Sequence, residues 1–250
     1  MSLEIANSTN PSLSSLSHIE AELNYITPMA EKPYKYVCEP PVGIPRENCV
    51  YESHRVPIWN GRAITSELSL DRQGFLFLSH HSVVNNFYDE NEIREIYYPE
   101  SEQFVKEVTG AARVIDFDYN LRNTQKAKEG VKGVSEPIRR IHNDYTPNSG
   151  YQRSRNELLA IGIDNPDRIL QNRFNLINLW RPIGHPVQES PLAVCDSRSI
   201  PSSDWVVSDL IFRDRVGETY LGLAESVPRC DAVWVMRSQI ESMVQEKQVK

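Results

Sequence analysis

Residues 140–146 read Arg-Ile-His-Asn-Asp-Tyr-Thr, and their pattern predicts a strand that runs out into a turn. Side chains two positions apart on a strand point to the same side. His142 and Asp144 therefore place an imidazole and a carboxylate on one face, where both could bind one divalent metal ion. A histidine and an aspartate at this spacing also occur often by chance, and an isolated strand-end histidine is usually a surface residue.

The segments around this motif carry a mixture of strand and helix signals. Short apolar runs predict strands at 75–78, 112–117, 174–180 and 192–195. Helical spacing and caps predict helices at 89–110, 150–161 and 165–171. The proline-rich stretch 23–60 should be extended. Because there is no regular strand–helix alternation and no Gly-rich phosphate loop, the sequence predicts a β-rich α+β domain.

Composition limits the function classes. The 250 residues carry 34 acidic and 27 basic side chains, a net charge of −7, which argues against nucleic-acid binding. No apolar run is long enough to span a membrane. The four cysteines show no CxxC spacing, and the N-terminal residues do not resemble a secretory leader. We therefore expect a cytoplasmic protein that binds a small molecule, without nucleic-acid or membrane partners.

Three runs occur in a characteristic order: the 140–146 run, Asn-Leu-Trp-Arg-Pro at 178–182, and Pro-Leu-Ala-Val-Cys-Asp-Ser-Arg-Ser at 191–199. Together they resemble the fungal AsaB-type hydroxylase/desaturase family, which includes relatives of the gibberellin desaturase and of the cephem methoxylase subunit. The resemblance extends over about residues 23–218.

This resemblance implies a distorted double-stranded β-helix, or jelly roll, with flanking helices, which binds Fe(II) and 2-oxoglutarate. Such enzymes hydroxylate, desaturate or rearrange small molecules in fungal secondary-metabolite biosynthesis. His142 and Asp144 match the first two iron ligands of the family. Arg181 and Arg198 are candidates for binding the carboxylate of the co-substrate, since a guanidinium fork suits that group. A salt bridge that braces the barrel is an equally weighted role for each arginine.

The family pattern breaks near the C-terminus, because the family's second iron-binding histidine is not found after Asp144. His185 is the one histidine there, and it lies in a proline-rich loop where the family has no ligand. Helical spacing predicts an amphipathic helix capped by Asp231, with apolar positions at Val233, Met236, Ile240 and Val244. We expect a disordered tail over 1–22, a jelly-roll domain over 23–220 whose closing strands are missing, and a divergent tail over 221–250.

Two explanations fit this break, a truncated gene product and a family member that has lost its triad. The favoured function is an oxidoreductase that modifies a fungal metabolite. The alternatives are an inactive paralogue that stabilises an active homologue, as a homodimer or heterodimer, and a cofactor-free isomerase or cyclase. Asp116 and Asp118 flank Phe117 and would share a face on a strand, so they could pose as paired catalytic carboxylates, but we expect a solvated pair at the barrel edge.

Overall fold

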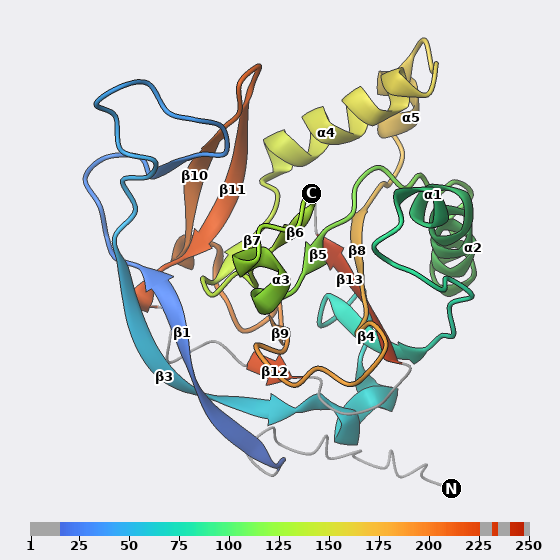
Figure 1. Ribbon diagram of the computed structural model, residues 1–250, viewed down its shortest axis with the longest axis horizontal. Coiled ribbons are helices and arrows are strands. Elements are labelled where there is room, and N and C mark those ends of the chain that lie inside the picture. Colours follow the sequence, from blue (N-terminus) through green and yellow to red (C-terminus); the bar gives the residue numbers. More distant parts are fainter. Residues whose placement is uncertain (1–15, 226–231, 235–240, 248–250) are drawn as a thin grey trace, which may run out of the picture.

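The computed structural model describes residues 16–225, 232–234 and 241–247, and for the last two ranges it describes only the backbone. Strands dominate, and they form three sheets and one short two-stranded ladder (Figure 1). The strands are β1 His18–Ile26, β2 Tyr34–Tyr36, β3 Tyr51–Asn60, β4 Phe75–Ser79, β5 Leu121–Arg122, β6 Val134–Ser135, β7 His142–Asn143, β8 Leu176–Trp180, β9 Ala193–Cys195, β10 Trp205–Ile211, β11 Val216–Gly222, β12 Ala232–Trp234 and β13 Glu241–Lys247.

Helices are fewer, and α1 and α2 stand together at one side of the molecule while α4 and α5 lie near the top of Figure 1. The helical elements are the 3₁₀ helix η2 Gly61–Glu67, α1 Glu90–Glu92, the π-helix η3 Ile93–Tyr97, α2 Tyr98–Thr109, α3 Thr124–Lys128, α4 Pro147–Ala160, α5 Pro166–Leu170 and the 3₁₀ helix η4 Ser202–Asp204. The predicted β-rich α+β class is confirmed.

The sheets bring together strands that are distant in the sequence. Their strand orders are β1-β3-β12-β9, β2-β10-β11-β7 and β4-β13-β8, with β5-β6 as the ladder. In the longest pairing, β1 runs antiparallel to β3, and Val56 and Ile58 alternate as buried residues on β3 with exposed neighbours between them. This alternation, together with Pro57 in β3, confirms that the proline-rich segment is extended.

The small apolar core beside the central strands comes from β4 and β9. Phe75 and Phe77 are buried with Val194, and Trp180 at the end of β8 packs against them. The alternation of β4 turns both phenylalanines to one side of the sheet, so the strand predicted at 75–78 is confirmed. This core supports the end of β8, the strand whose Asn178 contacts Asp144 of the His142–Asp144 motif.

Helix α4 begins three residues after Asp144, and its start is strongly specified. Thr146 is the N-cap: its hydroxyl accepts from the Ser149 amide at 3.1 Å, and the Ser149 hydroxyl accepts from the Thr146 amide at 2.9 Å. Pro147 occupies the first turn, where a missing N–H costs nothing. A reciprocal cap of this kind stabilises a helix by about 1 kcal/mol. The cap therefore fixes where the chain turns after the His142–Asp144 motif.

Two predicted boundaries are wrong. Strand β1 begins at His18, inside the tail expected to be disordered over 1–22, because its residues 18–26 pair along the whole of β3. Residues 1–15 lie outside the described residues. The domain end expected at 220 falls within β11, which continues to Gly222.

The predicted C-terminal amphipathic helix is also wrong in its described residues, since 232–234 and 241–247 are the strands β12 and β13. Each lies between two other strands: β12 pairs with β3 and β9, and β13 pairs with β4 and β8. Backbone pairing on both sides outweighs the weak helical spacing of the sequence. The sequence analysis expected the closing strands of the jelly roll to be missing. Strands β12 and β13 fill those positions, so that expectation is wrong. The predicted cap Asp231 lies outside the described residues.

Residues 112–117, predicted as a central strand, are irregular in the structure. They follow Gly110, whose left-handed φ of 69° ends α2. The amide of Asp116 donates to Glu102 Oε1 at 3.1 Å, so a side chain of α2 takes the place of a neighbouring strand. Among the described residues, no helix has the length and apolar character that a membrane span requires.

Candidate metal and ligand site

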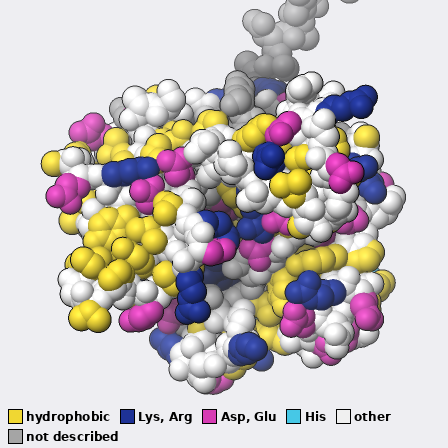
Figure 2. Space-filling model, turned by 90° about the horizontal axis from the view of Figure 1, so that it is seen from above, with side chains coloured by type: hydrophobic (Ala, Val, Ile, Leu, Met, Phe, Trp, Pro, Cys, Tyr) yellow, Lys and Arg dark blue, Asp and Glu magenta, His cyan; other side chains and the backbone are white. Residues whose placement is uncertain are grey.

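A broad cavity of 2620 Å³ lies beside β7, β8 and the first turns of α4. One face of the molecule is hollowed, and basic and acidic side chains gather around that hollow (Figure 2). His142, Asp144, Asn178 and Arg153 line the cavity. The candidate site therefore combines the strand-end motif with side chains from a second strand and a helix.

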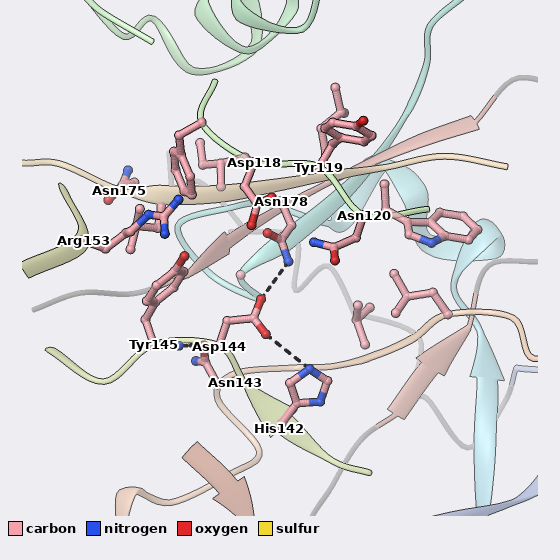
Figure 3. A pocket seen from close by; sticks show the side chains of 18 of the residues that line it. Asp118, Tyr119, Asn120, His142, Asn143, Asp144, Tyr145, Arg153, Asn175 and Asn178 are labelled. Carbon is pink, nitrogen blue, oxygen red and sulfur yellow. Dashed lines mark hydrogen bonds and ion pairs between the residues drawn. The ribbon is translucent and has the colours of Figure 1, made fainter. Parts of the chain in front are cut away.

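The structure brings His142 and Asp144 together, as the strand spacing predicts. His142 Nε2 lies 3.3 Å from Asp144 Oδ1, and the two side chains are 25% and 39% exposed (Figure 3). Strand β7 is held in the sheet by pairing of His142 with Leu221 of β11. The Thr219 hydroxyl also donates to the Asn143 carbonyl at 2.6 Å. Both polar groups thus face the cavity from a short strand that is fixed by its neighbour.

Two further contacts orient the pair. His142 Nδ1 lies 2.9 Å from the Arg140 carbonyl oxygen, and because a carbonyl can only accept, Nδ1 carries the hydrogen. In the neutral imidazole, Nε2 then keeps its lone pair on the side of Asp144. The Asn178 amide donates to Asp144 Oδ2 at 3.2 Å. Such outer hydrogen bonds are typical of metal-binding histidines and carboxylates. In the sequence, Asn178 stood out only as the first residue of the Asn-Leu-Trp-Arg-Pro run.

This donor set fits part of an iron site. Two ligands that each lie about 2.1 Å from one ion, at a right angle, are about 3.0 Å apart, close to the observed 3.3 Å. One imidazole nitrogen and one carboxylate oxygen are two of the three ligands of a 2-His-1-carboxylate triad. Within the described ranges, no group of three or more His, Cys, Asp or Glu side chains is arranged to hold a metal ion. The described residues therefore fit two ligand positions.

Arg181, a predicted co-substrate residue, lies at the end of β8 and is 9% exposed. Its Nη2 donates to His80 Nδ1 at 2.6 Å, and its Nη1 lies 3.8 Å from Glu100 Oε1. The Tyr97 ring lies 5.2 Å from its guanidinium carbon. Burial and the charge of Arg181 lower the pKa of His80, which keeps that imidazole neutral. These contacts join β8 to α2 and favour the bracing role.

Arg198, the other predicted co-substrate residue, forms a two-pronged ion pair with Asp196. Its Nη2 donates to Asp196 Oδ2 at 2.6 Å and its Nε to Oδ1 at 3.0 Å. Asp196 is buried, whereas the Arg198 side chain is 52% exposed, and Arg198 is not part of the cavity lining. The structure therefore does not bring Arg198 to the His142–Asp144 pair.

His185 lines the cavity as an exposed loop residue, and its Nδ1 lies 2.9 Å from the Pro186 carbonyl.

Asp116 departs from the expected solvated pair with Asp118. Burial, with a smaller contribution from Glu102, raises the pKa of Asp116 to about 7, and its Oδ2 is buried without a hydrogen bond among the described residues. The sequence missed this burial because it predicted a solvated carboxylate pair at the barrel edge, where the chain instead packs against α2.

Comparison with known proteins defines the class of this chain. The family described as the oxidoreductase/YMDC permease-like domain matches residues 23–235. The chain therefore belongs to this oxidoreductase family, and the predicted resemblance to fungal hydroxylases and desaturases is confirmed.

Similar curated proteins come from fungi. The chain is 31% identical over 192 residues to Oxidoreductase AN1597 of Emericella nidulans, with 74% of this chain and 63% of the relative covered. It is 29% identical over 222 residues to the hydroxylase/desaturase efuI of Hormonema carpetanum, with 83% of this chain and 71% of the relative covered. The chain thus spans about two thirds of the length of the curated relatives it matches.

A solved structure with a similar fold is the iron and alpha-ketoglutarate-dependent endoperoxidase NvfI. It aligns with a TM-score of 0.78 at 23% identity, over 92% of this chain and 83% of that chain. This likeness shows the fold, and the predicted jelly-roll architecture is confirmed.

Proposed function

We propose that this protein is a non-haem Fe(II)/2-oxoglutarate-type oxidoreductase that hydroxylates or desaturates a small molecule in fungal secondary metabolism. The family assignment and the names of the relatives support this class, since they include a hydroxylase/desaturase and an alpha-ketoglutarate-dependent dioxygenase. The observation that carries the proposal is the cavity-lining His142–Asp144 pair, with Nε2 and Oδ1 3.3 Å apart.

In this proposal, His142 and Asp144 hold the metal. The Arg140 carbonyl keeps the hydrogen of His142 on Nδ1, and Asn178 keeps the second oxygen of Asp144 turned away from the metal position. Iron and 2-oxoglutarate supply the oxidising chemistry when they are bound. The assignment of Arg181 and Arg198 to the co-substrate stays a prediction, and their ion pairs favour a structural role instead.

Metal binding by His142→Ala tests the proposal. Anaerobic Fe(II) titration of the wild-type chain should give one site, and His142→Ala should weaken it at least about 100-fold, since even losing an outer-shell partner costs 10–100-fold. His54→Ala is the matched control, because His54 Nε2 lies 3.3 Å from Glu52 Oε2 at the same sequence spacing but outside the cavity lining. Equal iron affinity of His142→Ala and the wild type would contradict the proposal.

The two alternatives give different results. An inactive paralogue that stabilises a homologue would take up no Fe(II) at millimolar concentration and would co-purify with an iron-containing homologue. A cofactor-free isomerase or cyclase would turn over its substrate in the presence of a chelator and without oxygen. Location in the cytoplasm and assembly with a homologue remain predictions from the sequence.

A further inference from the structure

Arg153 differs from Arg181 and Arg198, the two predicted co-substrate residues, in how its guanidinium is engaged. It lies in the second turn of α4, lines the cavity, and its side chain is 25% exposed. The Nη2 of Arg181 donates to His80, and the Nη2 of Arg198 donates to Asp196. The Arg153 guanidinium instead makes no hydrogen bond to another described residue.

The position of the Arg153 guanidinium is nevertheless fixed. Its carbon lies 4.5 Å from the centre of the Phe117 ring, which is the geometry of a cation–π contact. Its Nε lies 2.8 Å from Glu157 Oε1, one helical turn later. That approach does not have the geometry of a hydrogen bond, and Nε is buried without a partner among the described residues. The aromatic contact and the ion pair orient a planar fork whose donors are still available.

The cavity around Arg153 holds the hydrogen-bonding side chains of Tyr145 and Asn175, and the carboxylates of Glu157 and Asp118 also line it. Figure 3 shows Arg153, Tyr145 and Asn175 gathered on one side of the pocket, with the guanidinium directed toward the part that holds Asp144. The buried Nε of Arg153 has no hydrogen-bond partner among the described residues, and leaving such a donor without an acceptor costs about 1–3 kcal/mol, which a ligand oxygen would offset.

We propose that Arg153, with Tyr145 and Asn175, forms a carboxylate-binding subsite in the same cavity as the His142–Asp144 pair. The ligand is a small organic acid, and its carboxylate could belong to the co-substrate or to an acidic substrate. A guanidinium fork pairs with a planar carboxylate through two parallel hydrogen bonds, which gives orientation as well as affinity. This subsite rests on the proposed function for its role, but its ligand chemistry follows from the Arg153 contacts alone.

Binding of two acids to the full chain, measured by ligand-observed NMR in the presence of a chelator, tests the subsite. The probes are 2-oxoglutarate and 2-naphthoate, which represent the co-substrate and an aromatic acid substrate. Arg153→Gln should weaken at least one of them about tenfold or more, because hydrogen bonds to charged groups contribute about 1.5–3 kcal/mol. Arg153→Lys, which keeps the charge without the fork, should lie between Arg153→Gln and the wild type.

Arg155→Gln is the matched control. Arg155 lies on the same helix, pairs with Asp167 through its Nε at 3.1 Å, and is not part of the cavity lining. Its variant should bind both probes as the wild type does. A loss confined to 2-oxoglutarate assigns the subsite to the co-substrate, and a loss confined to 2-naphthoate assigns it to the substrate. If the wild type binds neither acid, or if Arg153→Gln and Arg153→Lys bind both as the wild type does, the proposal is overturned.

The same variants separate this proposal from the proposed function. Arg153→Gln should keep the Fe(II) affinity of the wild type, whereas His142→Ala should lose it. If the wild-type chain binds no iron but its binding of an organic acid depends on Arg153, the proposed function is contradicted and the subsite is supported. If the chain binds iron but no acid in a way that depends on Arg153, the subsite is contradicted and the proposed function is supported. Thermal unfolding followed by circular dichroism shows that each variant is folded.

Discussion

Two histidine–carboxylate pairs in the described part of the chain, His142–Asp144 and His54–Glu52, have the same spacing and the same separation but different surroundings. His142 and Asp144 lie 3.3 Å apart at the end of the short strand β7, in the cavity. His54 and Glu52 also lie 3.3 Å apart, within the long strand β3 and outside the cavity lining. Strand geometry alone produces this contact in both places, since residues i and i+2 share a face.

The difference lies in what holds each pair. The first pair has a carbonyl on His142 Nδ1 and an amide on Asp144 Oδ2. Within the described part of the chain, His54 contacts Glu52 and the edge of the Tyr25 ring, and Glu52 is 57% exposed. An exposed ion pair of this kind contributes about 0–1 kcal/mol to stability. A metal site therefore requires oriented ligands in a cavity, and the spacing of two residues is only the first condition.

Asp144→Ala and Glu52→Ala should give the sharpest contrast. Removal of the carboxylate from the cavity pair should weaken Fe(II) binding at least about 100-fold, and removal of Glu52 should leave it within error of the wild type. Anaerobic titration of both variants measures the two affinities. Similar affinities in the two variants would show that the cavity pair is no more a metal site than the surface pair.

Asp116 tests the effect of burial on a third carboxylate. Its pKa of about 7, against an ordinary 3.8, means that the folded protein keeps Asp116 neutral while the unfolded chain ionises. This group therefore costs no stability below about pH 4, its cost grows between about pH 4 and pH 7, and the full cost is present above about pH 7. One pKa unit corresponds to about 1.36 kcal/mol, which sets an upper bound of about 4 kcal/mol, and we expect about 2 kcal/mol for a partly buried side chain.

Asp116→Asn should therefore stabilise the protein more at pH 8 than at pH 4. Urea unfolding at the two pH values measures this difference. Asp118→Asn provides the comparison at the other carboxylate of the sequence pair. An Asp116→Asn effect that is the same at both pH values would show that Asp116 ionises in the folded protein as it does in the unfolded chain.

Asn178 tests the outer shell, with the smallest expected effect. Asn178→Ala removes the amide that holds Asp144 Oδ2 and should weaken Fe(II) binding about tenfold, at the lower end for an outer-shell residue. Asn172→Ala is the control, because Asn172 donates to backbone carbonyls at the end of α5. Unchanged iron affinity in Asn178→Ala would mean that cavity placement alone distinguishes the two pairs.

The sequence predicted the parts of the fold and site that depend on local rules. Alternation placed His142 and Asp144 on one face, and the caps Asp89 and Gly110 fixed the ends of the α1–α2 region. It failed where partners distant in the sequence decide the structure. The helical spacing of residues 233–244 gave no indication of strand β13, which pairs with β4 and β8. The sequence around Asp116 gave no indication that this side chain is buried against α2. Arg153 was visible as a residue type, but its contact with Phe117 was not.

The central position of β13 has a consequence for how this chain is made. Strands β4 and β8 are separated by about 100 residues in the sequence, and the strand that joins them is the last described element to leave the ribosome. Strand β13 begins about 160 residues after the end of β4, so at a synthesis rate of about 5–20 residues per second β4 waits about 10 to 30 seconds for its partner. During that interval its exposed backbone is a template for pairing with other chains. Folding yield in the cell should therefore depend on protection of the nascent sheet until translation is finished.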